Sequence, residues 1–207
     1  MVFFMKKFLK FVCTLLLIVA AFWLGSVTAD IRALQNSVIR LHVVADSDSE
    51  EAQSIKLQVR DAVLNKLQSA VNSLPDMESA REYIQAQLPE LERIANEVLE
   101  KAGQGCKAVV SFAKEAFPAR KYDTFSLPSG IYESLRITIG SGEGKNWWCV
   151  VFPGLCFGAT TEAFEDTAAG AGFGDSLTGA LTDEPPYRAR FFVMDCLGWI
   201  ENLFYAG

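Results

Sequence analysis

The stretch IRLHVVADSDSEEAQSIKLQVRDAVL, Ile39 to Leu64, joins a strand pattern to a helix pattern. Its first residues are β-branched and alternate between two faces, which predicts a strand over 38–45. An acidic run follows, in which Ser47 and Glu50 have capping-box spacing and mark the start of a helix. Apolar residues then recur at steps of three and four until Pro75, as in an amphipathic helix. A strand followed by a long amphipathic helix predicts a sheet covered by helices on one face.

The chain on either side of this stretch extends the same pattern. Asp76 caps a second helix through Leu88, and Pro89 fits the first position of a third helix that stops at Gly103. Further strands are expected over 107–113, 125–127, 131–139 and 147–152, with a hairpin signal at Pro128-Ser129-Gly130. The predicted fold class is α+β, with a mostly antiparallel sheet of about five strands and three helices packed on one face.

The chain divides into four segments by composition. Residues 1–29 form a signal peptide or N-terminal membrane anchor, and 30–157 form the α+β domain. Residues 158–186 are rich in Gly, Ala, Thr and acidic residues and are expected to be a flexible linker. Residues 187–207 are expected to form a C-terminal amphipathic helix, whose apolar positions are Phe192, Cys196, Trp199, Ile200 and Leu203.

The N-terminal segment has the order of a secretory signal. Lys6, Lys7 and Lys10 precede an uncharged run from Phe11 to Val27, and small residues lead to Ala29. Cleavage after Ala29 and an uncleaved anchor are both compatible with this order. In either case the positive-inside bias places the rest of the chain on the far side of the membrane.

The charge of the exported part argues against several partners. Removing the three lysines from 19 basic residues leaves 16 against 25 acidic ones, a net charge near −9. This sign disfavours nucleic acid and anionic lipid as the main partner, so we expect membrane contact only through the N-terminal segment. Four acidic residues (Asp46, Asp48, Glu50 and Glu51) lack the spacing of a calcium loop and suit helix capping. No metal site, cofactor or small-molecule substrate is predicted.

A second informative stretch is GEGKNWWCVVFPGLCF, Gly142 to Phe157. The glycine-rich loop before it lacks the spacing of a phosphate-binding loop, and a strand follows it instead of a helix. Trp147 and Trp148 must point to opposite faces of that strand, so one is expected in the core and the other exposed or covered by the terminal helix. An exposed tryptophan beside Lys145 and Asn146 is a candidate partner-binding site, and all four residues are its candidates.

The cysteines allow two further interpretations. Cys149 and Cys156 lie on the oxidising side of the membrane and are a candidate structural disulfide, which needs an irregular bend at 152–154. Alternatively, one of them pairs with His42, the only histidine, in a cell-envelope thiol hydrolase. The apolar surroundings of Cys149 argue for an inert thiol. A structural envelope protein held by an uncleaved anchor is a third alternative.

Two blocks resemble one known family. The stretch Ile39 to Leu64 is similar to the opening of the stage II sporulation protein R family, with Asp46 where Asn is usual. The stretch LPSGIYESLRITIGSGEGKNWWCVVFPGLCF, Leu127 to Phe157, resembles its other block, with Gly154 in place of a second Pro.

The resemblance implies a signalling protein of endospore-forming bacteria. Members of the family are made in the forespore and exported into the space between the forespore and mother-cell membranes. They are needed for activation of sigma-E in the mother cell, through a membrane-embedded aspartic protease that cleaves the pro-sigma factor. We therefore expect a non-enzymatic ligand, with 30–157 as its signalling domain and the protease as its partner.

Overall fold

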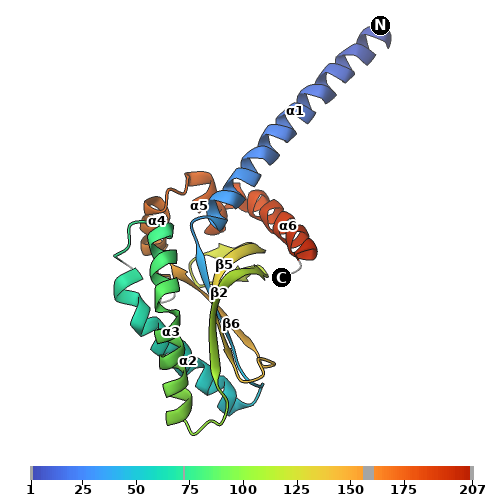
Figure 1. Ribbon diagram of the computed structural model, residues 1–207. Coiled ribbons are helices and arrows are strands. Elements are labelled where there is room, and N and C mark those ends of the chain that lie inside the picture. Colours follow the sequence, from blue (N-terminus) through green and yellow to red (C-terminus); the bar gives the residue numbers. More distant parts are fainter. Residues whose placement is uncertain (1, 72, 156–160, 206–207) are drawn as a thin grey trace.

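The structure, a computed structural model, describes residues 2–71, 73–155 and 161–205, and its fold is α+β (Figure 1). The elements follow one another as α1 (Val2–Gln35), β1 (Ile39–Val44), α2 (Glu50–Val71), α3 (Met77–Lys101), β2 (Ala108–Phe117), β3 (Arg120–Lys121), β4 (Ser126–Leu127), β5 (Gly130–Ile139), β6 (Asn146–Phe152), α4 (Thr161–Gly170), α5 (Asp175–Leu181), a 3-10 turn (Pro185–Tyr187) and α6 (Arg188–Phe204).

The main sheet has four strands in the order β2-β5-β1-β6, and β3 and β4 form a separate ribbon. The pairs β2–β5 and β1–β6 are antiparallel, whereas β1 and β5 at the centre are parallel. A parallel pair needs a crossover connection, which the helices α2 and α3 provide here. The expected antiparallel character therefore holds for the outer pairings, and the sheet as a whole is mixed.

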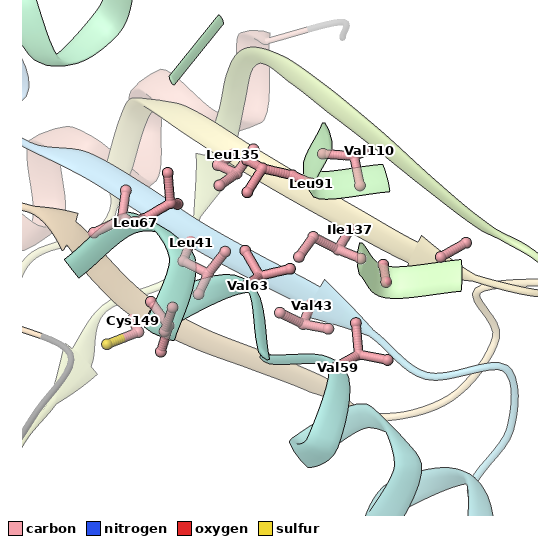
Figure 2. Close-up of a cluster of buried hydrophobic side chains, with 14 of the residues drawn as sticks. Leu41, Val43, Val59, Val63, Leu67, Leu91, Val110, Leu135, Ile137 and Cys149 are labelled. Atoms are coloured by element: carbon pink, nitrogen blue, oxygen red, sulfur yellow. The ribbon is translucent and has the colours of Figure 1, made fainter. Parts of the chain in front are cut away.

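The first hydrophobic core lies between the sheet and helices α2 and α3 (Figure 2). Alternate residues of the strands meet the apolar stripes of both helices there. The fully buried side chains at this contact include Leu41, Val43, Val59, Val63, Leu67, Leu91, Leu135 and Ile137. The period-two pattern of the strands and the three-to-four spacing of the helices predict this contact correctly.

Helix α2 begins, and helix α3 continues, differently from the sequence expectation. Ser49 accepts a hydrogen bond from the Ala52 N–H (3.1 Å), so it caps α2 in place of the expected Ser47. Asp76 caps α3 as predicted, accepting from the Ser79 N–H at 2.8 Å. However, α3 runs through Pro89 as one helix, so two helices, not three, cover this face. Its buried face is unbroken on both sides of the proline, and this packing outweighs one missing backbone hydrogen bond.

A second core covers part of the opposite face of the sheet. It is built from the end of α1 and from α4, α5 and α6, and its buried members include Val27, Leu34, Phe117, Tyr132, Phe164, Leu177, Leu181 and Met194. The described part of the expected linker is thus not flexible chain: it holds α4 and α5, which pack Phe164 and Leu181 into this core.

Helix α1 leaves the body as a long rod (Figure 1). Among the described residues it is the one helix long and apolar enough to cross a membrane. It continues without a break past Ala29, and its last turns pack into the second core through Val27 and Leu34.

Candidate partner-binding surface

The start of β6 lies at the end of the sheet farthest from α1. The chain enters β1 at Ile39 directly after α1, and β6 runs antiparallel, with Asn146 paired to Val44. Six residues of strand separate these two ends, roughly 20 Å. Figure 1 shows the same arrangement, with the turn between β5 and β6 opposite the base of α1. We call this end of the sheet the distal end.

The glycine-rich loop at the distal end is tied down by neighbouring chain. Asp46 accepts a hydrogen bond from the Ser141 N–H (2.7 Å), and Asp48 accepts one from the Lys145 N–H (2.8 Å). The Gly140 backbone has φ of +57°, and a Cβ there would lie 2.0 Å from the Asp46 carboxylate. The glycine therefore permits a close approach that no other residue allows. The loop is therefore held in one place, and Asp46 and Asp48 accept hydrogen bonds from it instead of capping a helix.

Trp147 lies on the helix-covered face of the sheet, at its edge. It pairs with Val43 in the β1–β6 register, and the guanidinium of Arg60 from α2 lies 4.2 Å from its ring centroid. Its exposed fraction is 38%. The side chain thus combines a cation–π contact on one side with an accessible apolar surface, as interface residues often do.

Trp148 lies on the opposite face and is half-buried. Its ring stacks on His42, with centroids 5.7 Å apart, and the Arg120 guanidinium lies 3.8 Å from its centroid. It also packs against the second core. The opposite orientation of the two tryptophans is as predicted, but neither is fully buried or free of contacts.

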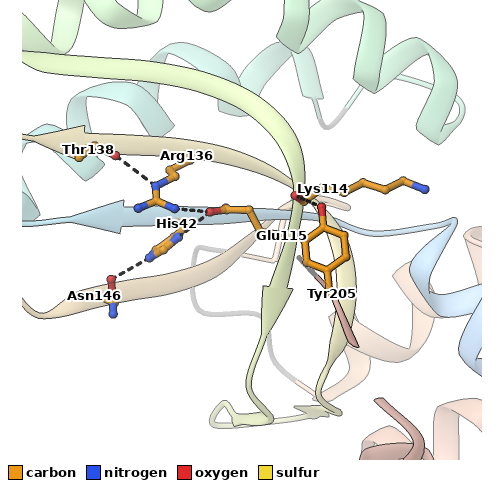
Figure 3. A network of polar contacts seen from close by, with 7 residues as sticks. All are labelled: His42, Lys114, Glu115, Arg136, Thr138, Asn146 and Tyr205. Carbon is orange, nitrogen blue, oxygen red and sulfur yellow. Dashed lines mark hydrogen bonds and ion pairs between the residues drawn. The ribbon is translucent and has the colours of Figure 1, made fainter. Parts of the chain in front are cut away.

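His42 belongs to a polar network on the face of the sheet opposite helices α2 and α3 (Figure 3). Its Nε2 lies 2.8 Å from Asn146 Oδ1, and its Nδ1 lies 3.4 Å from Glu115 Oε1. Arg136 donates to Glu115 at 2.7 Å and to Thr138 at 3.1 Å. Burial alone would raise the pKa of Glu115, but hydrogen bonding with His42 and Arg136 overcomes it and lowers the pKa to about 2. The carboxylate is therefore charged at neutral pH and orders this face.

Of the four predicted partner-binding residues, Lys145, Asn146 and Trp147 are exposed at the distal end, whereas Trp148 is half-buried on the other face of the sheet. Sequence reasoning missed Glu115 and Arg120, which support them. The strand expected over 107–113 continues to Phe117, so Glu115 was left outside it. The adjacent charges of Lys114 and Glu115 interrupt the apolar alternation, so no simple period marked the extension of the strand to Phe117.

The thiol-enzyme interpretation does not hold for Cys149. Cys149 pairs with Leu41 and points into the first core, on the opposite face from His42. It also belongs to a disulfide, whereas its predicted partner Cys156 lies outside the described residues, so their pairing stays a prediction. Within the described ranges, no cluster of three or more His, Cys, Asp or Glu side chains is placed to hold a metal ion.

Comparison with known proteins identifies the family. The family model of stage II sporulation protein R matches residues 35–162, which include the whole main sheet and its distal end. Stage II sporulation protein R of Bacillus subtilis (strain 168) is 42% identical over 189 residues, covering 83% of each chain. The chain belongs to the stage II sporulation protein R family. No solved structure matches it.

Family membership assigns the chain a role in sporulation. The family match ends at residue 162, before α5 and α6. The distal end is therefore part of the family's shared region, and the terminal helix lies beyond it.

Proposed function

We propose that this protein is an exported sporulation signal, which activates a membrane-embedded aspartic protease and so promotes cleavage of pro-sigma-E. It acts without chemistry of its own, from the space between the forespore and mother-cell membranes. The partner-binding residues are Lys145, Asn146, Trp147 and Trp148, at the distal end.

The observation that carries this proposal is the separation of the two ends of the molecule. The apolar α1 leaves one end of the sheet, and the surface containing Trp147 lies at the other end. A chain held by α1 in one membrane therefore presents the distal end to the space beyond. This geometry fits a ligand that must reach a protease in the facing membrane.

The surface also has the chemistry of a protein interface. Trp147 and the adjoining Lys145 and Asn146 are exposed, and the loop that leads into β6 is fixed by Asp46 and Asp48. A pre-ordered surface loses little conformational entropy on binding. Activation further requires that this surface bind the active arrangement of the protease more tightly than the inactive one, because only a difference in affinity shifts the equilibrium.

The test is reconstitution in a non-sporulating bacterium that produces the pro-sigma factor and the protease. Cleavage of the pro-sigma factor is followed by immunoblot with the full chain, with no chain, and with a version lacking residues 1–29 that stays in the cytoplasm. Cleavage that depends on the exported chain supports the proposal. Absence of cleavage with the full chain exported and folded contradicts it.

A matched pair of variants locates the surface. Trp147→Ala removes an exposed ring at the distal end, whereas Val109→Ala removes an exposed apolar side chain elsewhere on the sheet. Loss of cleavage with Trp147→Ala but not with Val109→Ala supports the assigned surface. Equal cleavage with both would place the contact elsewhere while leaving the signalling role intact.

A further inference from the structure

Helix α6 carries an apolar stripe that the fold leaves uncovered. The sequence marked these residues as the apolar face of an amphipathic helix, which ordinarily packs inward. In the structure Phe192, Trp199 and Leu203 are 67%, 58% and 61% exposed, and Cys196 between them is exposed as well. We call Phe192, Cys196, Trp199 and Leu203 the outer stripe. Its spacing of four, three and four residues keeps it on one side of the helix.

The other sides of α6 are occupied. One side contacts α1, through Arg190 to Asp30 at 2.6 Å and Gln35 to Glu201 at 2.8 Å. Another side contacts the sheet region, where the Ser129 N–H donates to Asp195 at 2.9 Å and Asn202 donates to the Phe117 carbonyl at 2.8 Å. The outer stripe lies on the remaining, exposed side of α6, and at its edge Cys196 and Trp199 line a shallow pocket with Pro118 and Ala119.

The position of α6 relative to α1 connects this stripe to the membrane segment. The uncharged run of α1 ends at Val27, and Arg190 in the first turn of α6 contacts Ser26 (3.2 Å) and Asp30 just beside it. Figure 1 shows α6 running crosswise from the base of α1, with the sheet on one side of it and the projecting α1 on the other. If α1 spans a bilayer, α6 thus begins where that span leaves the hydrocarbon.

We propose that α6 lies in the membrane interface beside α1, with the outer stripe buried among the lipids. A helix of this kind buries its apolar face roughly 5–10 Å into the boundary between headgroups and acyl chains. Trp199 suits that depth, since its ring is apolar and its indole N–H can reach the headgroups. The membrane contact then has two parts, α1 through the bilayer and α6 along it, and this replaces the expectation of contact through the N-terminal segment alone.

The width of the apolar surface favours lipid over a second copy of the chain. Ile200 and Phe204 are also exposed, at 45% and 84%, and they broaden the stripe on one side. A two-helix seam is narrower, with apolar residues at the a and d positions and charges flanking them. A bilayer surface, in contrast, accommodates a broad apolar arc. Helix α6 has such an arc and begins where the membrane span ends.

The test uses the full chain in phospholipid vesicles, without the protease, so that its result is independent of the signalling proposal. Cys13 and Cys106 are replaced by Ala, and Cys196 is labelled with an environment-sensitive fluorophore. Quenching is measured with lipids that carry a nitroxide near the headgroup and, separately, with aqueous iodide. Cys196→Ser defines the background labelling, and Glu143→Cys in that background puts the same label on an exposed loop residue at the distal end.

We expect the label at position 196 to be quenched severalfold more by the lipid nitroxide than the label at 143, and to be shielded from iodide. Phe192→Gln combined with Trp199→Gln should abolish the lipid quenching while the chain stays bound through α1. Val109→Gln, at an exposed apolar position on β2, should leave it unchanged. A label at 196 that iodide quenches and lipid does not would overturn the proposal. Shielding from both quenchers, with cross-linking of Cys196 to Cys196, would also overturn it and would indicate a second copy.

Discussion

His42 and Trp148 stack across strands β1 and β6, with ring centroids 5.7 Å apart and an interplanar angle of 18°. The same indole lies under the guanidinium of Arg120, and the same imidazole contacts Asn146. Trp148 therefore stabilises the fold and contributes to the distal surface at once. Trp147, on the other face, has an accessible ring and a contact with Arg60. The two tryptophans should consequently respond differently to substitution.

We expect Trp147→Ala to abolish or strongly reduce signalling with little effect on stability. The ring is more than one-third exposed, so its loss should lower the free energy of unfolding by about 1 kcal/mol, chiefly through the cation–π contact. Trp148→Ala should lower it by roughly 2–3 kcal/mol, because a partly buried aromatic ring is removed. Urea unfolding in detergent solution measures both, and pro-sigma cleavage measures signalling. Wild-type signalling by a folded Trp147→Ala chain would remove this residue from the partner-binding surface.

Glu115→Gln should make the free energy of unfolding depend less on pH in the acidic range. The pKa of Glu115 falls from 4.5 to about 2 in the folded chain, so its charged form is favoured by folding. This contribution is present above the unfolded pKa, near 4.5, and is lost as the pH falls toward 2. With allowance for solvent screening it amounts to roughly 1–2 kcal/mol at neutral pH.

Thermal unfolding at pH 7 and pH 3 tests this linkage. The variant should be less stable than the wild type at pH 7, and the difference should shrink at pH 3. Glu143→Gln, at an exposed loop position, is the control and should match the wild type at both values. A difference between Glu115→Gln and wild type that is the same at both pH values would show that the carboxylate charge is not the cause.

The first core could be predicted from the sequence because its rules are local. Alternation in strands and three-to-four spacing in helices place Leu41, Val63 and Ile137 inward before any topology is known. Helix α3 departs from this scheme at Pro89, where the proline rule predicts a break. The structure has no break there, because the continuous contact of the helix with the sheet stabilises it more than the loss of one backbone hydrogen bond at Pro89 destabilises it.

The second core could not be predicted in the same way. The segment 158–186 has no sustained period, since α4 and α5 are short and each supplies only a few buried residues, such as Phe164 and Leu181. For α6 the period shows that one side of the helix is apolar, but it does not show whether that side packs against the protein or faces outward. Its inner side is built from Met194 and Gly198, and the more apolar side faces outward. Periodicity identifies an apolar face, but which surroundings cover that face depends on tertiary packing and on the membrane.

Gly198→Ala should release α6 from the sheet. A Cβ at this position would lie 1.7 Å from the Ser129 carbonyl oxygen, which is backbone and cannot move independently. We expect a loss of at least about 2 kcal/mol in the free energy of unfolding, and faster amide exchange in α6 than in α2. Gly170→Ala is the matched control: a Cβ there would meet no atom within 4 Å, so the substitution should leave stability unchanged or raise it. Equal stability of the two variants would show that α6 does not dock closely at Ser129.

The folded chain should keep its N-terminal segment. The predicted cleavage point after Ala29 lies inside the continuous helix α1, where Val27 is 0% exposed and Asp30 is paired with Arg190 at 2.6 Å. Proteases act most readily on exposed, locally unfolded chain, and this segment is packed into the second core. A C-terminally tagged chain should therefore remain full-length in the membrane fraction, as judged by immunoblot and by mass spectrometry of its N-terminus. Arg190→Glu, which places like charges beside each other, should loosen this packing and increase cleavage, whereas Arg93→Glu on the exposed side of α3 should not. A soluble wild-type product that begins at Asp30 would contradict the prediction and would mean that α6 packs against a shortened helix.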